Sequence, residues 1–587
     1  MKVMALVIVL FFIACQFVQA QSKNEARDDL VLRAIDDELA RTMTRLQLKG
    51  HSRPYFCQFN LYENDDFSVE ATLGAVTSLT REKQRTFDPV VRVGDYKFDN
   101  TNFEKEESFA SASQEGYEQL GLISETPCED NYGAIRKTFW INTDYNYKKA
   151  VEALEAKKAY ILERSREEEL DDFIRVKPVV YVKPVENMVI DEKLWTDKVV
   201  SLSRIFRKYP EIRNSWVRFD ERIINTWMKN SEGTVIRTTQ KAVRILSYAN
   251  IQAKDGSVLT DGRVFLAHDR EHLPELKKIE TELDNLARSL IERSNAEKLD
   301  YYEGPVLFEG QAAGQVFARV MAPYLVNHRK KLGASYYDDS YNKLARRLGR
   351  RVMPLFLSVV DDPFARFYKG KSLFGGFTID DEGVVPEKLS LIEDGYLKTL
   401  CSGRTPSKYI SKSNGHGSYQ SGYETAKYSV LFVKSKETDS KSELLKKLKE
   451  LGRKSRLEYV IVVRRLANNV RDGSFFETVD SQSSNFGPLD GQLTSPIDFY
   501  KISLKTGKRT LLRGGKFGPV TVRLLKDIVA VGDDSDAYPV EDVSNNYFHL
   551  ITPSILISEV EIEKEDDVRK PPLIPNPLYE LVSERDR

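Results

Sequence analysis

The sequence predicts an α+β fold in two domains, and three observations lead to this prediction. The chain has 587 residues, far more than one average domain needs. Residues 24–48 carry apolar side chains at helical spacing, whereas residues 54–62 alternate between apolar and polar side chains as a strand does. Predicted strands dominate the second half of the chain. We therefore place a boundary near residues 297–303, with a first domain over 21–300 and a second over 301–567.

The composition supports large cores and gives no sign of a polyanionic partner. Hydrophobic residues make up 41% of the chain, which is ample for two buried cores. The 88 basic and 88 acidic residues cancel, so the chain has no net charge that would attract nucleic acid or an anionic membrane over a distance. We therefore expect no nucleic-acid partner.

The N-terminal residues 1–20 have the pattern of a secretory signal peptide. Lys2 precedes an apolar run over 3–14, which is too short to span a bilayer as a helix. We predict cleavage near Ala20, and Cys15 offers the alternative of a lipoprotein. The mature chain is then exported, either periplasmic or secreted. No other stretch is long and apolar enough to span a membrane.

The first domain is predicted to mix helices with a meandering sheet. The helix at 24–48 comes first, and a hairpin over 215–251, rich in β-branched residues, turns near Asn230–Gly233. The other predicted elements are strands at 54–62, 68–80, 91–102, 177–183 and 263–267, a long helix at 143–173 capped by Thr143 or Asp144, and helices at 191–207 and 274–296.

The second domain is predicted to be rich in strands. A short apolar strand at 305–308 leads into a helix that Pro323 ends, because proline cannot continue a helix. The other predicted elements are a buried strand at 352–360, two strands within 377–398, a basic amphipathic helix at 440–455, and strands at 459–463, 498–504, 509–513 and 555–563. The proline-rich tail over 568–587 has no core to join.

Several segments together resemble the TldD/PmbA family of metallopeptidase-related proteins, in particular its exported branch. GPVLFEGQAA at 304–313, followed by HRKK at 328–331, resembles the central segment of that family. Asp380-Asp-Glu-Gly383 and Ser413-Asn-Gly-His-Gly417 follow in the expected order, and RVGD and DNTN resemble the first half of the family. The resemblance implies a two-domain TldD/PmbA-like fold.

The resemblance also implies that the metal-binding positions of the family are empty in this chain. Metal-binding members carry HExxxH on the helix after the first strand, and aligning the flanking residues places Ala318, Arg319 and Pro323 on its three chemical positions. The family's third ligand is a cysteine near the C-terminus, but every cysteine here precedes Thr405. The resemblance thus implies a metal-free, non-catalytic subunit with no cofactor of its own. It would pair with a TldD-like paralogue that carries zinc, and the heterodimer would process peptides.

A second pattern keeps a metallopeptidase in its own right as an alternative. His268-Asp-Arg-Glu271-His272 matches the inverted zinc signature H-x-x-E-H. A strand precedes it and Pro274 follows it, so we expect a loop or helix entry instead. A further alternative is an exported peptide-binding or scaffold protein that keeps the fold.

Other polar residues are candidates for lining a cleft. His416 lies between two glycines beside Asn414 and Gly415, where backbone can approach a ligand closely, although a structural turn also explains them. His328 opens a basic cluster that is either a solvated helix end or an anchor for a partner or a substrate carboxylate. Asp380, Asp381 and Glu382 suit a hard cation or a turn.

The cysteines allow one disulfide. Cys57 and Cys128 could pair in an oxidising compartment and leave Cys401 free, or all three could be thiols.

Overall fold

The structure is a computed structural model, and it describes residues 29–104, 125–164, 169–333, 342–420, 423–467, 493–541, 547–565, 571, 574 and 576–578. The predicted signal peptide lies outside these residues. No helix among them is long and apolar enough to cross a membrane.

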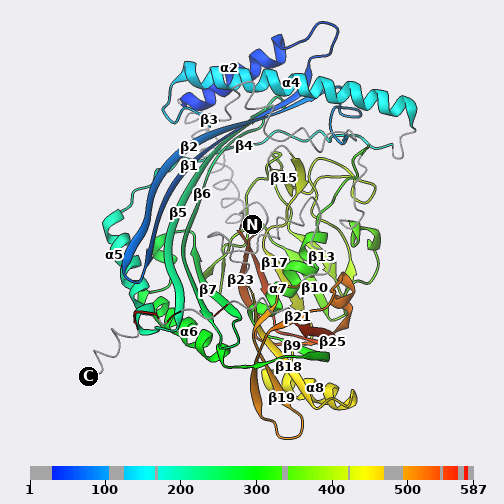
Figure 1. Cartoon of the computed structure of the whole chain (residues 1–587). Coiled ribbons are helices and arrows are strands. Elements are labelled where there is room, and N and C mark those ends of the chain that lie inside the picture. The colour runs from blue at the N-terminus through cyan, green and yellow to red at the C-terminus, as the bar shows by residue number, and fades with distance from the viewer. Residues whose placement is uncertain are drawn as a thin grey trace, which may run out of the picture.

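The first domain is built on a strongly curved sheet of seven strands (Figure 1). Four long antiparallel strands form its centre: β1 (Pro54–Thr72), β2 (Ala75–Val93), β5 (Ile212–Asn230) and β6 (Val235–Gln252). β3 (Glu125–Thr126) borders β2, whereas β4 (Val180–Val182) and β7 (Val258–Ala267) both pair with β6. The hairpin at 215–251 is confirmed, with its turn where we placed it.

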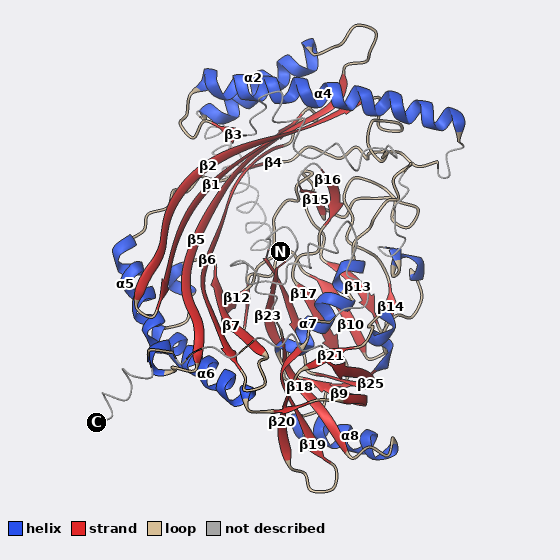
Figure 2. Ribbon diagram, in the orientation of Figure 1, coloured by secondary structure: helices blue, strands red, loops and turns tan. Residues whose placement is uncertain are grey.

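Alternation along β1 separates the two faces of this sheet. Odd-numbered residues such as Phe59 and Phe67 pack into the cores beneath the helices, whereas Gln58 on the opposite face reaches the second domain. Helices α2 (Leu30–Arg45) and α4 (Tyr132–Glu163) cover one end of the outer face, and α5 (Glu192–Ser203) and α6 (Leu276–Ser294) cover the other end (Figure 2). The 3-10 helix η1 (Arg204–Lys208) extends α5.

Several predictions for the first domain are wrong in their bounds. Of the strand expected at 91–102, only the residues up to Val93 lie in a strand, β2. The strand expected at 68–80 is interrupted by a turn at Leu73 and Gly74, both of which have positive φ. The long helix begins at Tyr132, because the side chain of Asn131 accepts a hydrogen bond from the backbone N–H of Ala134. It therefore starts eleven residues before the predicted cap at Thr143.

The second domain contains two larger sheets that pack around one core. The eight-stranded sheet runs β21 (Gly515–Phe517), β25 (Ile555–Lys564), β9 (Tyr301–Phe308), β18 (Tyr459–Leu466), β19 (Pro496–Ser503), β20 (Arg509–Arg513) and β8 (Glu297–Lys298), and β22 (Ile528–Val531) pairs with β25. The six-stranded sheet runs β14 (Tyr396–Leu397), β13 (Leu389–Glu393), β10 (Leu357–Asp361), β17 (Leu431–Ser435), β24 (Tyr547–Thr552) and β23 (Asp536–Glu541).

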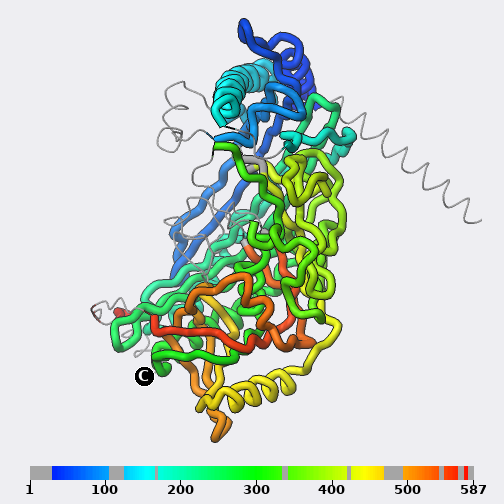
Figure 3. Tube along the Cα trace, turned by 90° about the vertical axis from the view of Figure 1, so that its right-hand side faces the viewer, coloured from blue at the N-terminus to red at the C-terminus, as the bar shows by residue number. Residues whose placement is uncertain are grey.

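Two small hairpins and several helical segments complete the second domain. The hairpins are β11 (Phe367–Tyr368) with β12 (Lys371–Ser372), and β15 (Gly417–Gln420) with β16 (Tyr423–Ala426). Helix α7 (Gln311–Val320) lies within the main core, α8 (Lys441–Lys454) covers β9 and β18, and η6 (Val522–Asp527) precedes β22. Figure 3 shows α8 and the α2–α4 pair at opposite ends of the molecule.

The second domain also corrects two predicted strands. Only Leu357–Asp361 of the expected strand 352–360 is extended in the sheet, and the segment before it turns around Pro354. The first of the two strands expected within 377–398 is absent, because residues 377–380 pair with no other strand, whereas the turn expected after it is confirmed at residues 380–384. The helix at 440–455 is confirmed as α8, which Ser440 and Glu443 begin with a capping box.

Candidate functional site

Helix α7 presents the three positions where the resemblance expected metal chemistry. Gly310, with φ of 56°, ends strand β9 and lets the chain enter the helix. Ala318 is almost fully buried on α7, and Pro323 lies beyond the helix in the 3-10 helix η3 (Ala322–Tyr324). Neither side chain has an atom that could bind a metal, and the Arg319 guanidinium is a permanent cation. The α7 positions therefore cannot form a zinc site.

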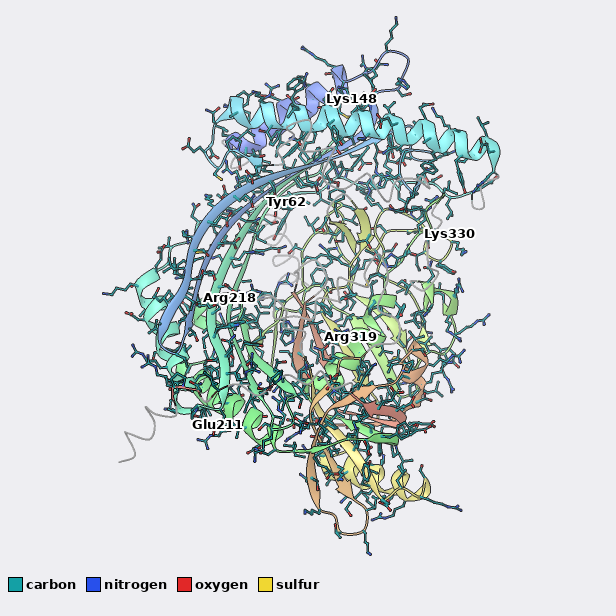
Figure 4. All side chains as sticks on the ribbon, viewed as in Figure 1. Tyr62, Lys148, Glu211, Arg218, Arg319 and Lys330 are labelled. Atoms are coloured by element: carbon teal, nitrogen blue, oxygen red, sulfur yellow. The ribbon has the colours of Figure 1, made fainter. Side chains whose placement is uncertain are left out.

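Arg319 faces a cavity of about 760 Å³ between the two domains. Residues from β7 and α6 line one side, and residues near β19, β21 and β25 line the other. Arg293, Arg319, Arg513 and Lys516 contribute positive charge to the lining, against the carboxylates of Glu563 and Glu565. Figure 4 places Arg319 in the second domain, across from the curved sheet.

A buried carboxylate next to this cavity joins the domains. Asp261 on β7 accepts hydrogen bonds from Arg293 at 2.9 Å and from both terminal nitrogens of Arg465 at 2.8 and 2.6 Å. Burial alone would raise the pKa of Asp261, but the charges of Arg465, Arg293 and Arg263 outweigh it and hold the pKa far below its usual range. Asp261 is therefore ionised and fixes arginines from both domains at the cavity wall.

The H-x-x-E-H residues do not converge on one point. His268 Nε2 lies 2.8 Å from the carbonyl oxygen of Leu373, and its ring stacks on Phe374. His272 belongs to the short 3-10 helix η2 (Arg270–His272), where its Nδ1 lies 2.7 Å from the Asp269 carboxylate. Glu271 is exposed. Burial lowers the pKa of His268, which favours its neutral form. The two rings therefore have separate partners.

The acidic turn at 380–383 uses its carboxylates to bind backbone N–H groups. The two oxygens of Asp380 each accept a hydrogen bond at 2.7 Å, one from Val384 and the other from Gly417. Glu382 accepts one from the backbone of Arg404 at 2.5 Å. A Cβ on Gly417 would come within 2.2 Å of the Glu382 carboxylate, so only glycine fits there. These contacts have the form of turn chemistry and leave no ready cation site.

The glycine-rich loop is also held from within. The side chain of Asn414 accepts a hydrogen bond from Ser402 N and donates one to Leu400 O, both at 2.8 Å. Gly415 has φ of 75°, which favours glycine. His416 is fully buried, so its ring does not reach an open surface where a substrate could bind.

His328 lies outside any helix and is half-buried, and burial lowers its pKa to about 4. The adjacent Arg329 binds the buried Asp172 at 3.1 Å, so the basic cluster is not a solvated helix end. Cys57, Cys128 and Cys401 are all free thiols in the structure.

The RVGD and DNTN segments form an ionic cluster that sequence reasoning missed. Arg92 binds Asp99 at 2.6 Å. The guanidinium groups of Arg92 and Arg404 both lie over the ring of Phe173, at 3.7 and 3.9 Å from its centre. Lys157 binds Asp172 at 2.6 Å, with both side chains fully buried. Lys157 lies on the buried, mostly apolar face of α4. A charged residue at such a position was the feature of the sequence that could have indicated a buried ion pair.

Solved structures share this architecture. A protein from Thermotoga maritima described as a candidate modulator of DNA gyrase is 15% identical, with a TM-score of 0.56, and the match covers 90% of this chain and 99% of that one. TldE from Thermococcus kodakarensis is 14% identical, with a TM-score of 0.55 and the same coverage. A protein from Bacteroides thetaiotaomicron with a similar gyrase description is 12% identical, with a TM-score of 0.52, covering 91% and 98%. These likenesses establish the fold.

The second domain also matches a known protein family. Residues 302–564 match the family model of the PmbA/TldA metallopeptidase C-terminal domain. This match over the second domain confirms the resemblance to the TldD/PmbA family noted in the sequence. A comparison with curated proteins finds no match.

Proposed function

We propose that this chain is the non-catalytic, metal-free subunit of a heterodimeric peptidase that processes peptides. One observation carries the proposal: Ala318, Arg319 and Pro323 occupy the positions that would have to bind and use zinc, and none of them can. The proposed partner is a TldD-like paralogue with an intact HExxxH motif, which supplies the catalytic zinc.

The charge of Arg319 favours a non-catalytic role for this chain. A glutamate at this position would accept a proton from metal-bound water. An arginine stays protonated, so it cannot accept that proton, and its charge repels a metal ion. The cavity beside it is lined by three further cations against the two carboxylates of Glu563 and Glu565, and this excess of positive charge suits the carboxylate of a bound peptide better than a catalytic cation. We also propose that the chain acts after export, as the first twenty residues predict.

Peptide cleavage by the mature chain, alone and mixed with the paralogue, tests this proposal. We expect no cleavage by the chain alone and cleavage by the mixture, abolished when the first histidine of the paralogue's motif is replaced. Cleavage by the chain alone, lost in His268→Ala, would overturn the proposal and make the inverted motif the active site. A matched control is His51→Ala, because His51 is a surface residue of the first domain, remote from both motifs.

A further inference from the structure

Three potential metal ligands meet in the core of the second domain, away from α7. Asp361 ends strand β10, Cys401 follows β14, and His416 precedes β15. Their ligand atoms all lie within 4.8 Å of one another, and all three side chains are fully buried. Among the described residues this is the one group of three or more such side chains with metal-binding proximity.

The hydrogen bonds around His416 assign the proton on one ring nitrogen. Nδ1 lies 3.0 Å from the carbonyl oxygen of Asn414 and 3.1 Å from its side-chain oxygen. That side-chain oxygen is identified by its bond from Ser402 N, and the amide nitrogen by its bond to Leu400 O. Both neighbours of Nδ1 are therefore acceptors, so Nδ1 carries a hydrogen.

The other ring nitrogen of His416, Nε2, faces the Asp361 carboxylate, which already accepts hydrogen bonds from other groups. Nε2 lies 3.0 Å from Oδ1 of Asp361, and that oxygen also accepts the hydroxyl of Ser429. The second oxygen of Asp361 accepts the backbone N–H of Ser429 at 2.6 Å. In a neutral ring, the lone pair of Nε2 would point at a carboxylate lone pair. Either a proton, held by the ring or by the carboxyl group, or a metal ion must therefore lie between them.

The position of Cys401 separates these two possibilities. A proton shared by His416 and Asp361 leaves the nearby thiol without a role, whereas a metal ion uses all three groups. Imidazole, thiolate and carboxylate are a ligand set for zinc, and a ligating histidine commonly donates its other N–H to a carbonyl, as His416 does. We propose that Asp361, Cys401 and His416 bind a structural Zn²⁺ ion.

The geometry fits such a site after a small contraction. Zinc bonds of about 2.0–2.3 Å in a tetrahedron place ligand atoms roughly 3.3–3.7 Å apart. The His416–Asp361 contact of 3.0 Å would lengthen slightly, and no other separation in the group has to close by more than about 1 Å. The Ser429 hydroxyl donates a hydrogen bond to the same oxygen of Asp361 that lies near His416.

The ion would cross-link segments that lead to the first domain. The loop of His416 and the acidic turn are bonded together, and the carbonyl oxygen of Asp381 accepts a hydrogen bond from Gln58 on β1 at 2.8 Å. This zinc is closed to solvent and distinct from α7, so it is structural. The expectation that the chain holds no metal came from α7 and the C-terminal region and does not cover this group.

Zinc content and cobalt spectroscopy of the mature chain test the proposal. We expect about one zinc per purified chain, and the Co²⁺-substituted protein should show a thiolate-to-cobalt charge-transfer band. Cys401→Ser should abolish that band and weaken metal binding at least about tenfold. The matched control is Cys57→Ser, another fully buried free thiol, which should keep both the zinc and the band.

A metal-free chain that takes up neither Zn²⁺ nor Co²⁺ would overturn the proposal. Nitrogen NMR of His416 showing hydrogens on both ring nitrogens would likewise assign the cation as a proton. The wild-type cobalt spectrum needs no substitution, so the test survives if Cys401→Ser fails to fold. Peptide cleavage is not a readout here, and failure of the zinc site therefore leaves the heterodimer proposal standing.

Discussion

At the scale of single residues, burial between the two domains shifts the pKa of an acidic side chain. Asp88 on β2 is half-buried there, and Tyr419 of the β15–β16 hairpin donates a hydrogen bond to it at 3.4 Å. Burial raises the pKa of Asp88 to about 6, and the bond from Tyr419 offsets only part of this effect. The native state therefore binds this proton more tightly than the unfolded chain does.

We predict that Asp88→Asn stabilises the protein above pH 6. The ionised carboxylate destabilises the native state once the pH exceeds the native pKa, so wild-type stability should fall between about pH 4 and pH 6. The variant should gain on the order of 1–3 kcal/mol at pH 7 and match the wild type below pH 4. Urea unfolding across this range measures the difference.

The control for this prediction is Asp66→Asn, because Asp66 forms an exposed pair with Arg222. It should change stability by less than about 1 kcal/mol at any of these pH values. An Asp88→Asn variant that loses stability at pH 7 would show that the charged form is bound favourably, contrary to the burial argument.

At the scale of single elements, local capping decides where helices begin. Ser440 and Glu443 exchange hydrogen bonds at the start of α8, whose apolar side packs on β9 and β18. A cap of this kind was readable from the sequence. The start of α4 was not, because Asn131 caps the helix far upstream of the charged segment that suggested it.

We predict that Ser440→Ala destabilises the second domain by about 0.5–2 kcal/mol, because backbone N–H groups at the helix start lose their acceptor. Hydrogen exchange of α8 and urea unfolding measure this loss. Lys446→Ala, within the same helix, removes no cap and should change stability by less than about 0.5 kcal/mol. Equal effects of the two substitutions would contradict the capping argument.

A structural element could be predicted from the sequence when the residues that determine it lie close together in the chain. The hairpin at 215–251 was predictable because Asn230 and Gly233 mark its turn, whereas Leu73 adopts a positive φ that its residue type disfavours. The helix that carries Ala318 and Arg319 was predictable from its apolar spacing. The group of Asp361, Cys401 and His416 was not, because three distant segments supply it and no spacing links them.

At the scale of the whole molecule, the two domains are held together by charge at a buried point. Asp261 of the first domain binds Arg465 of the second, and Arg293 binds the same carboxylate. Asp255 adds a further link, since it binds Arg513 at 3.0 Å. Removing the charge of Asp261 leaves arginines with like charge side by side in a buried place.

We predict that Asp261→Asn lowers the free energy of unfolding by about 3–5 kcal/mol, the usual cost of leaving buried charges without a partner. Because the pKa of Asp261 is depressed in the native state, its carboxylate contributes fully to stability above about pH 4, and this contribution declines only as the pH falls further. Urea unfolding at pH 7 measures the loss. Asp220→Asn, which affects the half-buried pairing with Arg244, is the control and should cost less than about 1 kcal/mol.

The pairing of β1 with β5 also dictates when the first domain can be completed during synthesis. Gln58 pairs with Asn230 and Ala71 with Val217, so the central ladder of the sheet joins residues separated by most of that domain. The β1–β2 hairpin leaves the ribosome long before its partner strand exists, and pairing so remote in sequence closes slowly. Until then one full edge of a nineteen-residue strand stays open to other chains. We therefore expect the nascent chain to need chaperone protection until residue 230 has been synthesised.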